Sequence, residues 1–291
     1  MTIVVQTIIS GVIAGTVYGL LGLGLSLCYK TTRVVNFAHG SIAMLGAYTA
    51  YSLDEHGASI LAASVAGILT AAFASAAMEL LVLWPLYRRS LISAILATFG
   101  VAIVVESIIQ MTWGSVAKAP PALLSTRSLD LGVTLSENDL GTFGLAVAIS
   151  AALIVGLQST RIGRAMRGVA QDSHVVELLG VPSRRLYLLA LALVGATAGV
   201  AGLLIGPSIG LAPDSGLGLT VYGFAAAVLG GLGSLHGAVV GGILIGVTHN
   251  VAAVYVTGTY ADVVQYAAIG LVLLVRVRGL FGDELEAVRG V

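Results

Sequence analysis

Long apolar runs recur along almost the whole chain, and they constrain its fold more than any other feature. A membrane-crossing helix needs about 20 apolar residues, and nine runs are candidates, of which the second, seventh, eighth and ninth are short. They cover roughly residues 3–28, 36–53, 58–83, 91–113, 140–158, 186–206, 217–235, 238–256 and 261–275. We therefore predict an all-α integral membrane protein of about eight to nine transmembrane helices, some short or broken, forming one domain over residues 1–291.

Composition supports a membrane protein. Apolar residues make up 57% of the chain and charged residues only 10%, whereas soluble domains carry about 25% charge. Lipid must therefore be the solvent for much of the surface. The formal net charge is zero, so no basic face suggests a nucleic-acid partner.

Glycine recurs at helical spacing. One row is Gly11, Gly15 and Gly19, and others are Gly237–Gly241, Gly242–Gly246 and Gly195–Gly199–Gly202–Gly206. Such rows let helix backbones approach closely in a membrane, so we expect them at helix–helix contacts. The break at 230–237 predicts a tight turn or unwound segment, with a re-entrant pair as the alternative.

The basic residues predict the orientation of the spans. With nine spans, 12 of the 14 lysines and arginines fall on one side, and only Lys118 and Arg127 lie on the other. By the positive-inside rule, the N-terminus is then outside the cell and the C-terminus is cytoplasmic.

The segment 161–185 is the most informative soluble loop. Apolar residues Val169, Val176 and Leu179 share one stripe of an amphipathic helix, which Gly180 would end. A helix too short to fold alone needs a surface on which to rest, and that surface is either a partner protein or the membrane interface.

Four motifs resemble permease subunits of branched-chain amino acid ABC importers, in the LivH-like branch. They are Gly163-Arg164-Ala165-Met166-Arg167 with Ala170-Gln171-Asp172 and Leu179-Gly180; Asn36-Phe37-Ala38-His39-Gly40; Ala226 to Ser234; and Arg276-Val277-Arg278-Gly279-Leu280-Phe281-Gly282. The wider ABC importer pattern begins Glu-Ala-Ala, which Ala170-Gln171-Asp172 replaces, and Val277 stands where the family usually has proline.

The resemblance implies a bacterial inner-membrane, multi-pass transport subunit rather than an enzyme. Its expected partners are a second, LivM-like permease, two cytoplasmic ATPases and an extracytoplasmic solute-binding protein. The resemblance also implies that the loop contacts the ATPase through Arg164, Ala170, Asp172, Leu179 and Gly180. No phosphate-binding loop is present in the sequence, and we expect no cofactor.

Polar residues within the spans indicate a substrate path. Asn36, His39, Gly40 and Ser41 open the second span, on a helix end that either borders a water-filled path or is held by an Asn36 cap and a His39 hydrogen bond. Glu106 lies deep in the fourth span, where it either borders the path or bonds to Gln110. Glu79, in the third span, is expected to extend toward Arg88 and Arg89 at the interface.

Two other functional classes are weaker. An ion-coupled secondary transporter usually needs intramembrane charges, for which Glu106 is nearly the sole candidate. An intramembrane enzyme or metal site needs a concentrated set of ligands, which five scattered histidines and one cysteine do not supply. Within the importer class the resemblance implies branched-chain amino acids as the default solute, and it leaves other amino acids, urea, short amides and aromatic acids as alternatives.

Overall fold

The structure is a computed structural model of the 291-residue chain. It describes residues 2–86, 90–120, 122–124, 127–130, 134–178, 180–256, 263, 267, 270, 274 and 279–282. Residues 87–89, position 179 and most of 257–291 lie outside the described residues, and with them lie Arg88, Arg89, Leu179 and most of the ninth predicted span.

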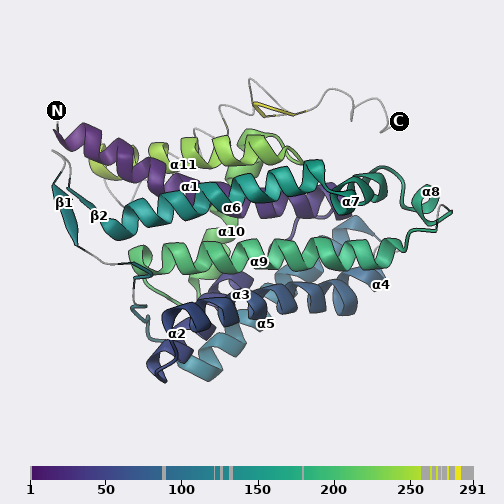
Figure 1. The fold of residues 1–291 in the computed structure, drawn as a ribbon, viewed down its shortest axis with the longest axis horizontal. Helices are drawn as coiled ribbons and strands as arrows, with labels where there is room; N and C mark the ends of the chain where they lie inside the picture. Colours follow the sequence, from purple (N-terminus) through teal and green to yellow (C-terminus); the bar gives the residue numbers. More distant parts are fainter. Residues whose placement is uncertain are drawn as a thin grey trace.

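Helices dominate the described chain (Figure 1). In chain order the elements are α1 (Thr2–Thr32), α2 (His39–Glu55), α3 (Ile60–Met78), the π-helix η1 (Glu79–Leu83), α4 (Trp84–Leu86), α5 (Leu91–Trp113), β1 (Ser128–Asp130), β2 (Thr134–Ser136), α6 (Glu137–Ser159), α7 (Arg161–Gln171), α8 (Ser173–Leu178), α9 (Ser183–Ile209), α10 (Ser215–Gly230) and α11 (Leu235–Tyr255). The two strands form one antiparallel hairpin.

The long helices lie roughly along one axis, which gives the bundle two ends (Figure 1). We call one the α7 end, because it carries α7 and α8, and the other the hairpin end, because it carries β1 and β2. Six helical segments are long and apolar enough to cross a membrane, and α10 is a shorter apolar helix. The all-α membrane class is confirmed, because these segments fall on the predicted runs.

Burial separates central from peripheral helices. In the most apolar window of α1, 67% of residues are buried, and in that of α9, 61%, against 22–28% for α3, α5 and α6. Large apolar side chains on the peripheral helices are exposed, including Phe73 at 76% and Met111 at 88%. An apolar exterior around a packed interior is the arrangement that lipid solvation favours.

The glycine rows lie where helices touch. A Cβ on Gly15 of α1 would lie only 2.7 Å from the Cα of Ile243 on α11, and one on Gly11 would lie equally close to the Cα of Val247. Side chains at these positions would push the two helices apart, so the close approach requires glycine. The row on α9 packs likewise, with Gly199 against α3 and Gly202 against α2.

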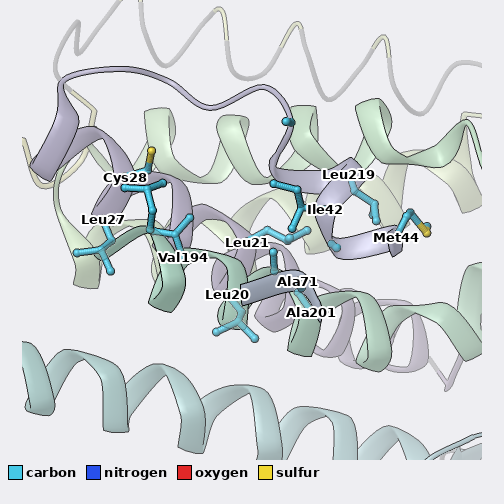
Figure 2. Packing of buried hydrophobic residues seen from close by; sticks show 14 of the residues in the cluster. Leu20, Leu21, Leu27, Cys28, Ile42, Met44, Ala71, Val194, Ala201 and Leu219 are labelled. Atoms are coloured by element: carbon cyan, nitrogen blue, oxygen red, sulfur yellow. The ribbon is translucent and has the colours of Figure 1, made fainter. Parts of the chain in front are cut away.

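The interior is built around α1. Leu20, Leu21 and Leu27 of this helix meet side chains from α2, α3, α9 and α10 (Figure 2). Cys28 is buried among them as a free thiol, as its apolar surroundings predict.

The turn between α10 and α11 is tight, as one of the two predictions for 230–237 had it. Gly231 and Gly233 adopt φ values of 103° and 88°, which residues other than glycine rarely adopt. Ser234 then caps α11 by accepting a hydrogen bond from the backbone N–H of Gly237.

Glu79 is the first residue of η1, and its side chain is only 1% exposed. Arg88 and Arg89, toward which it is expected to extend, lie outside the described residues, so that expectation stays a prediction. The π-helix has a local cause, because Pro85 has no N–H to donate to Leu81, and the N–H of Trp84 bonds instead to the oxygen of Glu79, five residues back.

Candidate substrate path and coupling surface

The second span begins well inside the bundle. After α1 ends at Thr32, residues 33–38 are not helical, and α2 starts only at His39. Arg33 makes the reversal with a positive φ of 59°, and the Thr32 hydroxyl oxygen accepts a hydrogen bond of 3.1 Å from the N–H of Val34. The connecting segment therefore turns back along α1 and leaves the start of α2 inside the protein.

Asn36 and His39 lie inside the bundle at the non-helical segment 33–38, which we call the α2 break. Both are fully buried, and the Asn36 side-chain oxygen accepts a 2.9 Å hydrogen bond from the N–H of Ala38. Asn36 thus forms a turn just before the helix, while Ala38 is the N-cap residue. Among the described residues, neither ring nitrogen of His39 has a hydrogen-bond partner. The backbone of Leu21 in α1 nevertheless lies close to the ring, so the bond to a neighbouring span stays a prediction.

The His39 ring lies beside Gly24 of α1 and Thr197 of α9. A Cβ on Gly24 would come within 2.7 Å of both side chains. The structure therefore places His39 inward, between the two central helices, rather than on an open surface.

Gly40 and Ser41 turn toward α10. The N–H of Gly40 donates a 2.8 Å hydrogen bond to the Thr220 hydroxyl, which is itself 3.2 Å from the oxygen of Phe37. A Cβ on Gly40 would overlap the carbonyl oxygen of Gly216. The first turns of α2 and α10 therefore cross in direct backbone contact, so both short helices begin at the same depth.

Glu106 of α5 contacts both helices where α2 and α10 cross. The Ser41 hydroxyl donates a 2.9 Å hydrogen bond to Glu106 Oε1. The same oxygen lies beside Gly216, in the first turn of α10, where the positive end of a helix dipole stabilises negative charge. In the described chain Ser41, rather than Gln110, is the partner of Glu106. The carboxylate is half-buried, so this group reaches the surface of the chain.

Three phenylalanines adjoin the break, a feature that sequence reasoning missed. The rings of Phe37 and Phe99 stack with centroids 4.2 Å apart, and Phe224 lies 5.9 Å from Phe37. All three are half-buried and come from different elements. Only Phe37 could have been noticed beforehand, because it lies inside the Asn-Phe-Ala-His-Gly motif.

The loop 161–185 forms two helices, and the single amphipathic helix predicted here is wrong. Asp172 interrupts it with φ −157° and ψ 104°, and its carboxylate accepts a 3.2 Å hydrogen bond from the N–H of Val175 in α8. The aspartate thus ends α7 and caps α8. Val169 is buried and Val176 packs against the core, but they belong to different helices.

The remaining loop residues lie at the α7 end. Arg164 donates a 2.9 Å hydrogen bond to the oxygen of Ser159, and Ala170 is half-buried. Gly180 is exposed with φ 80°, and Leu179 lies outside the described residues. In α8, Val175 is 51% and Leu178 76% exposed, so this helix presents apolar side chains away from the bundle.

No group of three or more histidine, cysteine, aspartate or glutamate side chains that could hold a metal occurs among the residues that the structure describes.

Comparison with known proteins identifies the family of this chain. The profile of the family described as branched-chain amino acid transport system, permease component, matches residues 7–273. The chain is 30% identical to the high-affinity branched-chain amino acid transport system permease protein LivH of Salmonella typhimurium and 31% identical to BraD, the protein of the same description in Pseudomonas aeruginosa. Each alignment covers 97% of both chains.

A solved structure supports the fold alone. It is PsaBC from Streptococcus pneumoniae in complex with a Fab, with a TM-score of 0.51 and 13% identity over 92% of this chain and 90% of the other. A permease component transports rather than catalyses, in agreement with the prediction of a non-enzymatic subunit. The chain belongs to the family of permease components of branched-chain amino acid transport systems.

Proposed function

We propose that this chain is the transmembrane permease subunit of an ATP-driven importer for branched-chain amino acids, and that it forms the solute path with a second, LivM-like permease. The names of its relatives support the solute class. The observation that carries the proposal is the crossing of α2 and α10, two short helices that begin beside Glu106 inside the bundle.

The solute path runs past this crossing. Helices that begin within the membrane present backbone groups and dipole ends to a bound solute, and transporters use them in this way. Here Gly40 and Ser41 supply the close-packed start of α2, and Glu106 supplies a half-buried carboxylate at its edge. Asn36 and His39, both fully buried, hold the break in place and so position the groups that border the path.

The path carries few fixed charges. An amino acid zwitterion has no net charge, and strong binding midway would slow its release. One carboxylate beside small groups and the Phe37, Phe99 and Phe224 rings suits an apolar side chain that passes with its charged groups solvated.

The chain crosses the membrane nine times in this proposal, with the N-terminus outside and the C-terminus in the cytoplasm. Of the lysines and arginines in the described ranges, only Lys118 and Arg127 belong to the segment between α5 and α6 that carries the hairpin. The others lie at the end of α1, in α7 and at the start of α9. This skew supports a cytoplasmic α7 end. The ninth crossing is the predicted span 261–275, most of which lies outside the described residues.

The α7–α8 segment contacts the ATPase. Its exposed apolar residues, Val175 and Leu178, and the exposed Gly180 offer a surface that a partner can bury. Arg164, Ala170 and Asp172 shape this segment, and Leu179 completes the proposed contact.

Two measurements test the function. Purification from the native membrane should recover an ATPase with this chain, and a binding screen on the cognate extracytoplasmic receptor should favour leucine, isoleucine and valine. A receptor selective for urea, short amides or other amino acids would change the solute and keep the importer. A chain that purifies without an ATPase and transports by an ion gradient would instead be a secondary transporter.

A further inference from the structure

A cavity of about 420 Å³ lies at the α7 end, apart from the α2 break. Its walls come from the last turns of α1 and α6, from α7, from the turn before α11 and from Phe281. The polar groups that line it include Lys30, Gln158, Arg167 and His236. Neither the proposed path nor the proposed ATPase contact needs these four side chains.

The described lining of the cavity is positively charged. Lys30 and Arg167 both line it, and no aspartate or glutamate occurs among its described lining residues. Arg167 donates to the backbone oxygens of Leu157 and Gln158 at the end of α6. The ends of α1 and α6 each bring about −0.5 charge and the start of α11 about +0.5. Two full cationic charges therefore exceed the helix-end charges, and a net positive charge remains for an anionic ligand.

Most of the remaining lining residues are apolar, apart from Thr31 and Ser234. Leu27, Met166, Leu235 and Phe281 line the cavity, so its ligand combines an anionic group with hydrocarbon. A soluble inorganic anion would leave these side chains without a partner.

The rim of the cavity faces the membrane boundary. Gln158 of α6 and His236 of α11 are hydrogen-bonded at 2.7 Å across the two helices, and both are exposed. Farther along the same helices, Val155 is 59% and Leu244 42% exposed. Apolar exposure of this kind is typical of lipid-facing surfaces, so the rim lies where the hydrocarbon ends and the headgroups begin.

We propose that this cavity binds the phosphate headgroup of an anionic phospholipid. Lys30 and Arg167 contact the phosphate oxygens, and the apolar walls receive the glycerol and the first carbons of the acyl chains. The bound lipid contacts the ends of α1 and α6, the start of α11 and the side of α7 that lines the cavity. It thereby stabilises the position of α7 against these helices. The proposal requires only that the α7 end lies at a membrane boundary, and it does not depend on the solute.

Native mass spectrometry tests the site. The full-length chain is purified in detergent with the subunits that accompany it, and titrated with phosphatidylglycerol or with zwitterionic phosphatidylethanolamine. We expect preferential binding of phosphatidylglycerol, weakened about five-fold by Lys30→Gln, since a cationic residue contributes about 1 kcal/mol to anionic lipid attraction. Lys30→Gln with Arg167→Gln should weaken it further, and Lys30→Arg should restore it. Arg161→Gln, on an exposed residue of α7 outside the cavity, is the matched control and should leave binding unchanged.

Three results would overturn the site. One is equal phosphatidylglycerol binding by the native chain and the double variant when circular dichroism shows both folded. Another is displacement of the lipid by inorganic phosphate at similar concentration, which would make the site a soluble-anion site. The third is lipid binding only after the ATPase has been stripped away, which would make the cavity a protein contact. The lipid site is tested by binding and the proposed function by transport. A failure of the lipid proposal can therefore be told apart from a failure of the proposed function.

Discussion

The hydroxyl of Ser41 donates a 2.9 Å hydrogen bond to Glu106 Oε1 and thereby ties the first turn of α2 to the middle of α5. The two residues are 65 positions apart in sequence. Their pairing explains why a carboxylate is tolerated within a span, because the hydroxyl and the start of α10 replace part of its lost hydration.

Replacing Glu106 separates hydrogen bonding from charge. Glu106→Gln keeps an acceptor for Ser41, whereas Glu106→Leu leaves the fully buried hydroxyl unpaired, at a cost of about 1–3 kcal/mol. We expect solute uptake to fall more with leucine than with glutamine, and the thermal midpoint in detergent to fall only with leucine. Gln110→Leu, one turn further on an exposed position, is the control. Equal loss of uptake in the glutamine and leucine variants would show that charge, rather than the bond, is required.

Gly40 is expected to be intolerant of any side chain. A Cβ there meets the Gly216 carbonyl, and overpacking of this kind costs about 1–3 kcal/mol. Gly40→Ala should therefore lower the thermal midpoint of the purified protein and lower uptake. Gly100→Ala, on a helical glycine with no atom within 4 Å of the added Cβ, should do neither. A stable, active Gly40→Ala variant would show that the two helices separate more easily than the structure indicates.

The residues of the proposed path differ in how far the sequence could predict their surroundings. Hydropathy is a local property, so the apolar helices in the described part of the chain were predictable to within a few residues, and α5 has the predicted bounds 91–113. The partner of Glu106 was not predictable, because Gln110 is one turn away in sequence while Ser41 is brought close only by the folded bundle. The cluster of Phe37, Phe99 and Phe224 was not predictable either, because only the folded bundle brings these three residues together.

The loop 161–185 shows a different limit. Apolar spacing runs through Asp172 without interruption, so the pattern favours one helix. The aspartate side chain accepts a hydrogen bond from the N–H of Val175 and ends α7. The spacing of apolar residues does not predict this interruption.

The burial of Glu79 was also not predictable from its position near the end of a span, because neighbouring helices determine how much of its side chain is exposed.

Gly180 tests the ATPase contact. Valine at φ 80° is strained by about 1–2 kcal/mol, and its side chain would enlarge the exposed end of α8. Gly180→Val should lower ATP-driven uptake and receptor stimulation of the ATPase while membrane insertion persists. Gly57→Val is a matched control, because Gly57 has φ 86° and open surroundings in the turn between α2 and α3. Asp172→Lys should act like Gly180→Val. Undiminished ATPase stimulation in both loop variants would remove this segment as the contact.

Cysteine labelling tests the orientation. With the buried Cys28 as background, Ser125→Cys should react with a membrane-impermeant maleimide added outside intact cells. Ser173→Cys should react only after the membrane is opened. Reaction of both positions from the same side would refute the nine-span topology.

Reconstituted transport tests whether the chain is part of an ATP-driven importer. The chain is placed in proteoliposomes with its second permease, its ATPases and its solute-binding protein, and radiolabelled leucine uptake is measured. We expect uptake that requires ATP on the ATPase side and the loaded binding protein on the other, and that persists when proton and sodium gradients are collapsed. Leucine uptake that proceeds without ATP and stops when an ion gradient is collapsed would contradict it.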